Sequence, residues 1–432
     1  MNATTPAGSI SPIVKVTRHP PRLGVLSEEP GGQQLIYQVG LPFQLSPTQA
    51  GLLLNIRLGR TRVVDLEMGA DLVLFDDPDR IGADGAVALI RSWDQKHPRT
   101  GDDLLMVSSL PTGGFVPLGA RRADGSPHPH AGTGFGLSAA HGYPLKLAQQ
   151  EDTHLDVKSD IFGQLELMQF AFDGRTFRVT ERRRLDLDEL LPGHQVQFLA
   201  LGAAIPSRDD LLSGITTGSF GAQNAGVARW SRGRDGRWAI IEHQVLAENV
   251  CEPSIVRDTD GSILLAFRPW GPTTTEPDRL HIQRSTDEGR TWERLCVVEP
   301  FWQMCPITIN RAADGRPYVC ANRFREPRQQ RLATREMLWA WPLSDDRQSL
   351  LGPVLVRDGP GEWGPTPNGS VWRMDHPLGQ TLRLADGQWR HLLCYRVLDD
   401  AEMRTDAGAT DRTGCYVEEV ISAGPPLPPW RF

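Results

Sequence analysis

The fold of this chain is decided by residues 253–298, "PSIVRDTDGSILLAFRPWGPTTTEPDRLHIQRSTDEGRTWERLCVV". Apolar runs alternate there with clusters of Asp, Gly, Pro, Ser and Thr. Such alternation predicts short β-strands joined by turns and loops. The predicted strands are 253–257, 262–268, 279–285 and 291–298, and the connections between them are 258–261, 269–278 and 285–292.

The strand order predicts which connections lie together. In an antiparallel meander the first and third connections lie at one end and the second lies at the other. Residues 258–261 and the box "STDEGRTW" (285–292) are therefore predicted to share one end. Glu252, Arg268 and the connection 269–278 are predicted to lie at the opposite end. We expect the chemistry at this second end and interpret the box as a structural bracket.

The same unit recurs along the chain. "CPITINRAADGRPYVCANR" (305–323) and "HPLGQTLRLADGQWRHLLCYR" (376–396) each contain two strand-like runs around an Asp-Gly turn. All three copies begin with a residue followed by proline, namely Glu252, Cys305 and His376. Weaker copies of the hairpin are predicted at 170–179, 231–240 and 108–118.

Recurrence of a four-stranded unit every 50 to 70 residues is typical of a β-propeller. We predict an all-β chain, 1–432, that forms a single propeller domain with six blades, or seven as the alternative. The best-defined blade is 250–300, followed by blades at 301–358 and 359–422. The N-terminal segment, about residues 1–20, includes "SPIVKVTR" (11–18), a candidate strand to close the last blade.

Composition argues against two classes of partner. The chain has 46 basic and 53 acidic residues and no basic block, which argues against nucleic-acid binding. No apolar run is long enough to span a membrane, and the first residues lack the pattern of a signal peptide. We expect a soluble protein, cytoplasmic by the absence of a signal peptide, or secreted or periplasmic if the chain is a mature fragment.

The six cysteines predict no metal centre. They are Cys251, Cys296, Cys305, Cys320, Cys394 and Cys415. None forms a Cys-x-x-Cys pair, and several stand in apolar runs such as "PYVCAN". We interpret them as small buried thiols rather than zinc ligands or disulfides, and we expect no cofactor.

Two stretches resemble a known family. "STDEGRTW" matches the S-x-D-x-G-x-T-W Asp-box of sialidases and related BNR-repeat proteins. "CEPSIVRDTDGSILLAFR" (251–268) resembles the sialidase segment in which a glutamate is followed, across one hairpin, by an arginine. The resemblance covers roughly residues 160–422 and implies a propeller that acts on a carboxylate-bearing sugar.

The resemblance also implies roles for individual residues. Glu252 would partner a tyrosine nucleophile, and Arg268 would belong to an arginine clamp on the substrate carboxylate. Arg335 is the nearest match for a further clamp arginine, within a loop that also carries Arg323. Tyr395 is the best-placed tyrosine for the nucleophile. Guanidinium groups suit this task because they bind carboxylates through paired hydrogen bonds and stay charged.

The sequence also departs from the family. The Arg-Ile-Pro motif that supplies the first clamp arginine in the family is not present. "PPRLGV" (20–25) is at most weakly similar to it. The acid/base aspartate is not fixed, with Asp94, Asp102 and Asp103 as candidates. Trp270, in the predicted connection 269–278, is a candidate for stacking on a sugar ring.

Histidines support an alternative chemistry. "SPHPHAGTGFGLSAAHGY" (126–143) places His130, His141 and Tyr143 around a glycine-rich stretch. These side chains are either solvated loop residues or the acid and base of a polysaccharide lyase acting on uronate-containing glycans. His376 fits either mechanism, because it occupies the same slot in its repeat as Glu252 does in its own.

Three functions follow as hypotheses. The first is a sialidase-like exo-glycoside hydrolase with an arginine clamp and a Tyr/Glu pair. The second is the lyase. The third is a propeller without catalytic activity that binds sugar or protein. In the first two, the expected partner is an acidic oligosaccharide or polysaccharide.

Overall fold

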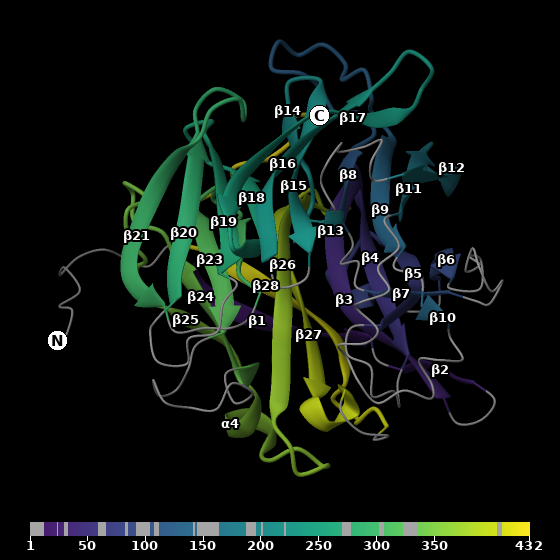
Figure 1. The fold of residues 1–432 in the computed structure, drawn as a ribbon, viewed down its shortest axis with the longest axis vertical. Coiled ribbons are helices and arrows are strands. Elements are labelled where there is room, and N and C mark those ends of the chain that lie inside the picture. Colours follow the sequence, from purple (N-terminus) through teal and green to yellow (C-terminus); the bar gives the residue numbers. More distant parts are fainter. Residues whose placement is uncertain are drawn as a thin grey trace.

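The strands predicted over 253–298 form one antiparallel sheet in the structure, which is a computed structural model (Figure 1). They are β18 (Val250–Arg257), β19 (Ile263–Pro269), β20 (Asp278–Ser285) and β21 (Glu293–Phe301), paired in chain order. The structure describes residues 13–23, 25–29, 33–58, 66–82, 85–91, 104–107, 112–140, 143–144, 164–186, 196–199, 202–219, 222–269, 278–301, 306–322, 335–403 and 408–432.

Six antiparallel sheets form the ring of a six-bladed β-propeller, which confirms the predicted fold class. We number the blades 1 to 6 in chain order, so that β18–β21 form blade 4. Blade 1 holds β3 (Gln33–Ser46), β4 (Gln49–Leu58), β5 (Leu66–Phe75), β6 (Val87–Arg91) and β7 (Leu104–Val107), with β2 (Val25–Glu29) and β10 (Tyr143–Pro144) at its edges. Blade 2 holds β8 (Thr112–Val116), β9 (Thr133–Ala140), β11 (Gln164–Phe172) and β12 (Phe177–Asp186).

The remaining blades follow the same plan. Blade 3 holds β13 (Val196–Leu199), β14 (Ile205–Ser207), β15 (Asp210–Ser219), β16 (Ala222–Arg232) and β17 (Trp238–Glu248). Blade 5 holds β22 (Thr308–Arg311), β23 (Pro317–Asn322), β24 (Met337–Pro342) and β25 (Val354–Asp358). Blade 6 holds β26 (Trp372–Arg383), β27 (Trp389–Asp399), β28 (Gly414–Ser422) and β1 (Ile13–Leu23). The described helices are α4 (Gly359–Trp363), η1 (Pro78–Arg80) and η4 (Asp400–Met403).

The N-terminal strand closes the ring. β1 pairs with β28 through Ile13 with Ser422 and Val16 with Val420, so the described part of residues 11–18, from Ile13 onward, lies in the last blade. The first and last parts of the described chain therefore share one blade. Six apolar clusters fill the spaces between neighbouring blades, so the core is distributed around the ring rather than gathered at one centre. The described cysteines Cys251, Cys320, Cys394 and Cys415 are buried thiols, as predicted.

The Asp-Gly hairpin turns adopt the same backbone conformation. The glycines of the turns at Asp260, Asp314 and Asp386 have φ values of 87°, 87° and 77°, which a side chain would disfavour. Each aspartate carboxylate also accepts a hydrogen bond from the backbone N–H two residues later. We call the end of the ring that carries these turns the turn end.

The predicted hairpin at 108–118 is wrong. Residues 112–116 form the single strand β8, and Gly113 and Gly114 lie within it. A Cβ at Gly113 would lie 2.3 Å from the carbonyl oxygen of Phe135, so the glycine permits close strand pairing rather than a turn.

The box "STDEGRTW" lies at the turn end, as predicted. Ser285 pairs with Ile263, which pairs with Arg257, whereas Cys251 pairs with Arg268 at the other end of the same sheet. Asp287 accepts hydrogen bonds from the Thr291 backbone N–H at 2.8 Å and from the Thr291 hydroxyl at 2.6 Å. These hydrogen bonds hold the pKa of Asp287 well below its usual range. The box is a turn brace.

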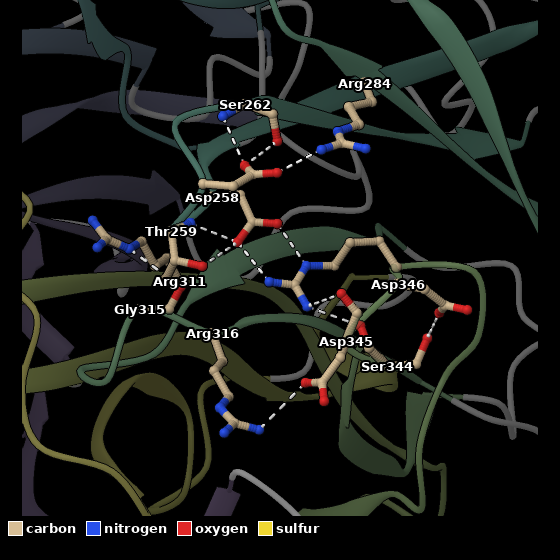
Figure 2. Close-up of polar contacts among 12 residues, drawn as sticks. Asp258, Thr259, Ser262, Arg284, Arg311, Gly315, Arg316, Ser344, Asp345 and Asp346 are labelled. Atoms are coloured by element: carbon tan, nitrogen blue, oxygen red, sulfur yellow. Dashed lines mark hydrogen bonds and ion pairs between the residues drawn. The ribbon is translucent and has the colours of Figure 1, made fainter.

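Ion pairs join neighbouring blades at the turn end. Arg347, between β24 and β25, binds both carboxylate oxygens of Asp258 in blade 4, at 2.5 and 2.8 Å. Figure 2 shows Asp258 facing the segment that carries Ser344 and Asp345. A bidentate pair of this kind fixes the relative orientation of its two elements.

Residues 423–432 run across the turn end. The Leu427 N–H donates to the carbonyl of Ala313 in blade 5, and the Arg121 N–H, after β8 of blade 2, donates to the carbonyl of Arg431. Phe432 stacks on Trp389 of blade 6 with ring centroids 6.2 Å apart. The segment therefore ties three blades together on the face away from Glu252.

Ring closure generates a first prediction. Ile13 is buried in the cluster between blades 5 and 6, whereas Ile421 on the adjacent strand is exposed. Ile13→Ala should lower the free energy of unfolding by about 2–4 kcal/mol, because a buried side chain is lost and a cavity is left. Ile421→Ala is the matched control and should change it by less than about 0.5 kcal/mol. Chemical denaturation followed by circular dichroism measures both, and equal effects would contradict the role of β1.

The box generates a second prediction. Asp287→Ala removes several hydrogen bonds that brace one turn and should cost about 1–3 kcal/mol of stability. Because the folded pKa of Asp287 is depressed, this contribution is present above the unfolded pKa, about 3.9, and is lost as pH falls toward the folded value. The difference between wild type and variant in thermal unfolding should therefore persist at pH 5. Asp235→Ala, in another hairpin turn, is the control and should cost less, because a single backbone N–H, that of Arg237, loses its acceptor.

Candidate functional site

Two inner strands carry the same backbone irregularity at the end opposite the turns. β18 and β26 each have a register shift, between Cys251 and Ser254 and between Asp375 and Leu378. We call this end of the ring the bulge end. At these bulges Glu252 and His376 adopt φ values of 49° and 55°. The predicted equivalence of their two slots is confirmed.

Such backbone conformations are costly for residues other than glycine. A side chain at positive φ, here followed in both cases by proline, costs on the order of 1–3 kcal/mol and persists only where the surroundings impose it. Strained residues of this kind concentrate at functional sites. Among the described non-glycine residues with positive φ, Glu252 and His376 are the ones followed by proline, and both lie at bulges of inner strands, so they are the first candidates for function.

Glu252 forms an ion pair with Arg268. Arg268 stands at the end of β19, paired in register with Cys251, and its Nη1 lies 2.8 Å from Oε2 of Glu252. The two side chains keep 14% and 13% of their surface exposed. Burial, the largest single influence, acts to lower the pKa of Arg268, but the charge and hydrogen bond of Glu252 together with the neighbouring Cys251 raise the pKa overall. The guanidinium of Arg268 therefore carries a permanent charge at a site that is largely shielded from solvent.

A second carboxylate contacts three guanidinium groups and one imidazole. Asp375, fully buried, accepts from Nε of Arg396 at 2.7 Å, from Nε of Arg373 at 3.0 Å and from Nη1 of Arg335, and its Oδ1 lies 2.7 Å from Nδ1 of His376. Burial alone would raise the pKa of Asp375, but the charges of Arg396, His376 and Arg335 hold it well below its usual range. Removing one partner from a buried network of this kind typically costs about 3–5 kcal/mol.

The two groups lie within electrostatic reach of each other. The charge of Arg335 acts to lower the pKa of Arg268, and the charge of Glu252 acts to raise the pKa of His376. Arg396 also donates to Gln38 of β3 at 2.9 Å, which brings blade 1 into contact with the network. We call Glu252, Arg268, Arg335, Arg373, Asp375, His376 and Arg396 the axial cluster.

Sequence reasoning found four members of the axial cluster and missed three. Glu252, Arg268, Arg335 and His376 were predicted, and Asp375, Arg373 and Arg396 were not. A signal existed in "WRMDHPLG" (372–379), where two charged residues alternate within an otherwise apolar strand just before the His-Pro slot. Charges in a buried strand require partners, so this pattern indicates a network.

Tyr395 lies outside the axial cluster, which corrects its predicted role as a nucleophile. It is fully buried between blades 5 and 6, where Arg357 Nε donates to its hydroxyl at 2.9 Å and the hydroxyl bonds Glu418. The physical reason is strand alternation: Arg396 points toward Asp375, so its neighbour Tyr395 points to the other face of the sheet.

The other tyrosines with described side chains also have partners elsewhere. Tyr37 donates to Asp71 at 2.6 Å, Tyr318 bonds His391 at 2.8 Å, and Tyr416 stacks on Tyr395. Within the part of the chain that the structure describes, no tyrosine is therefore recorded as a partner of Glu252.

The remaining predicted residues either fall outside the described part of the chain or lie elsewhere in it. Trp270, Arg323 and His141 lie outside the described residues, as do Asp94, Asp102 and Asp103. Tyr143 belongs to β10 at the edge of blade 1, paired with Leu105. His130 lies between β8 and β9 at the turn end, with its ring 5.3 Å from that of Trp238.

A membrane-spanning helix and a cluster of metal ligands are both absent from the described residues. No helix in them is long and apolar enough to cross a membrane. No group of three or more His, Cys, Asp or Glu side chains in them is arranged to hold a metal ion.

Comparison with known proteins supports the fold and does not assign a family. No protein-family model matches the sequence, and no curated protein matches it. Among solved structures, a mutant of Trypanosoma rangeli sialidase that displays trans-sialidase activity superposes with a TM-score of 0.56 at 13% identity, over 95% of this chain and 60% of that one. The NanB sialidase from Streptococcus pneumoniae gives 0.52 at 11% identity, over 95% and 71%.

A Dyadobacter fermentans protein of unknown function is similar over nearly its whole length, with a TM-score of 0.53 at 14% identity over 94% of this chain and 99% of that one. This chain thus spans about 60% of the length of the trypanosomal sialidase. At these identities the comparisons show a shared architecture, and the chain has the sialidase-like six-bladed propeller fold.

Proposed function

We propose that this protein is a sialidase-like glycoside hydrolase that binds a carboxylate-bearing sugar at the axial cluster. The observation that carries the proposal is the convergence of the Glu252–Arg268 ion pair with Arg335 and His376 at the bulge end. Ligand sites in propellers lie near the axis, where loops from several blades meet.

The arginines supply the affinity for an acidic sugar. Arg268 and Arg335 keep 14% and 13% of their side chains exposed, whereas Arg396 keeps 2%. We assign the substrate carboxylate to the two more exposed guanidinium groups and regard Arg396 as the internal anchor of Asp375. A carboxylate on a partly desolvated guanidinium forms charge-assisted hydrogen bonds, which are stronger than neutral ones.

The chemistry requires a group that moves a proton and a group that stabilises positive charge at the anomeric carbon. Glu252 is an anion beside the arginines and fits the second task. The described tyrosines have other partners, which favours the imidazole of His376 for the first task. This assignment departs from the Tyr/Glu pair expected from the resemblance.

A lyase acting on uronate-containing glycans is the second candidate. The presence of an imidazole beside arginines favours it, because the same arginines would neutralise the uronate carboxylate while the imidazole removes the neighbouring C5 proton. The two reactions give different products. A lyase leaves an unsaturated uronate that absorbs in the near ultraviolet, and a hydrolase leaves a saturated sugar.

Binding of acidic sugars tests the clamp. Isothermal titration calorimetry with N-acetylneuraminic acid and with glucuronic acid should show binding to the wild type, and neutral glucose should bind more weakly. Arg268→Ala should weaken binding of the acid by about 10- to 100-fold, because a hydrogen bond to a charged group is worth about 1.5–3 kcal/mol.

Arg284→Ala is the matched control, because Arg284 pairs with Asp260 at the turn end. It should leave affinity unchanged. Equal affinity of wild type and Arg268→Ala for the acid would overturn the clamp. Turnover is measured with 4-methylumbelliferyl glycosides of both acids and with a uronate polymer. Binding without any product would favour the third hypothesis, a propeller without catalytic activity.

A further inference from the structure

His376 contacts Asp375 through one specific ring nitrogen. Its Nδ1 lies 2.7 Å from Oδ1 of Asp375, at a bulge with strained backbone within the inner strand β26. We propose that Asp375 is a positioning residue that keeps the proton of His376 on Nδ1 and so presents a lone pair on Nε2, which accepts a proton from a hydroxyl of the bound sugar or from water. The acceptor role rests on the proposed function, whereas the position of the ring proton does not.

The ionised carboxylate determines the tautomer. Asp375 is fully buried and binds three guanidinium groups, which stabilise its charged form. An ionised carboxylate only accepts hydrogen bonds, so the imidazole nitrogen beside it must be the donor. In a neutral imidazole the other nitrogen then carries the lone pair.

Burial lets Asp375 orient the ring without charging it. Burial, the largest influence, lowers the pKa of His376, the charge of Asp375 acts to raise it, Arg396 acts to lower it, and Glu252 acts to raise it. The net shift is downward, because burial and the charge of Arg396 outweigh the two carboxylates. Arg268 adds a further positive charge nearby, paired with Glu252.

The backbone also restricts the ring. His376 has φ of 55° and is followed by Pro377, so the residue has little freedom to move away from Asp375. Such strain is retained where the surroundings over-determine it, and the ion pairs of Asp375 provide that constraint.

In the proposed step a proton moves from oxygen to Nε2 of His376. The O–H bond of the sugar hydroxyl or water breaks, its electron pair stays on the oxygen, and the proton joins Nε2. The ring becomes an imidazolium with protons on both nitrogens, and its positive charge lies 2.7 Å from Asp375 at Nδ1. No oxidant or co-reactant is required.

The wild-type protein tests the tautomer directly. With ¹⁵N-histidine labelling, two-bond ¹H–¹⁵N correlation spectra at pH 7 distinguish protonated from unprotonated ring nitrogens, and His376→Gln assigns the signal. The expected result is a proton on Nδ1 and none on Nε2. His391 is a buried internal control whose pKa is lowered to about 3 by burial, so its ring must be neutral. A proton on Nε2 of His376, alone or with one on Nδ1, overturns the proposal.

The pH dependence of ring reactivity tests the neutral state. Diethyl pyrocarbonate modifies unprotonated imidazole nitrogens, and peptide mass spectrometry follows modification at His376. Because the pKa of His376 is lowered, its neutral form should persist to more acidic pH than in N-acetylhistidine, and the half-maximal rate should lie below the ordinary value of about 6.5. A half-maximal rate at or above that pH contradicts the proposal.

Variants at Asp375 test the acceptor role. Asp375→Asn replaces an acceptor with an amide that can also donate, so it should lower kcat at least 10-fold with little change in KM, whereas Asp375→Glu should restore part of kcat. A loss confined to KM would overturn the positioning role. If Asp375→Asn does not fold, the wild-type spectra and reactivity still decide the tautomer and charge.

The outcomes separate this inference from the proposed function. If the spectra show the Nδ1–H tautomer but the protein neither binds nor cleaves acidic sugars, the orientation of His376 holds. The proposed function and the acceptor role of Nε2 are then both wrong. If the spectra show the Nε2–H tautomer and the protein cleaves acidic sugars, the tautomer proposal is wrong and the proposed function holds.

Discussion

The buried charge of Asp375 is the constraint on which the bulge end depends. A carboxylate with no exposed surface is tolerable only if cations and hydrogen-bond donors surround it, and here three arginines contact it, with the ring of a histidine beside them. Arg335 approaches from blade 5, Arg373 and Arg396 belong to blade 6, and Arg396 also bonds Gln38 of blade 1. Asp375 and Arg396 together thus link three of the six blades.

The two ends of the ring use polar groups in different ways. At the turn end, aspartates are occupied by local backbone N–H groups or by an arginine of the next blade, and residues 423–432 cross that face. At the bulge end, Glu252 and His376 stand in strained conformations beside arginines that keep part of their surface exposed. The contacts that brace the ring are concentrated at the turn end, and the partly exposed charged groups lie at the bulge end. This arrangement is typical of sites built on a propeller scaffold.

Much of the fold could be predicted because its signals are local. An Asp-Gly pair between apolar runs specifies a hairpin turn whatever the rest of the chain does, and its repetition specifies the blades. The box at 285–292 fixed the phase of one blade and so indicated which end holds Glu252 and Arg268. The hairpin predicted at 108–118 failed because glycines there permit close strand pairing, a requirement set by Phe135 on the neighbouring strand.

The residue pattern alone predicted the propeller, a strand to close it, the end of the ring at which Glu252 and Arg268 lie, and the shared slot of Glu252 and His376. Only the tertiary structure decided that Asp375 joins these residues and that Tyr395 does not. The reason is strand register: Asp375 pairs with Arg396 across β26 and β27, so Tyr395, the neighbour of Arg396, points to the other face, and sequence order does not report that register. Which charges meet across three blades is likewise set by the closure of the ring, which brings together residues as far apart in the chain as Gln38 and Arg396.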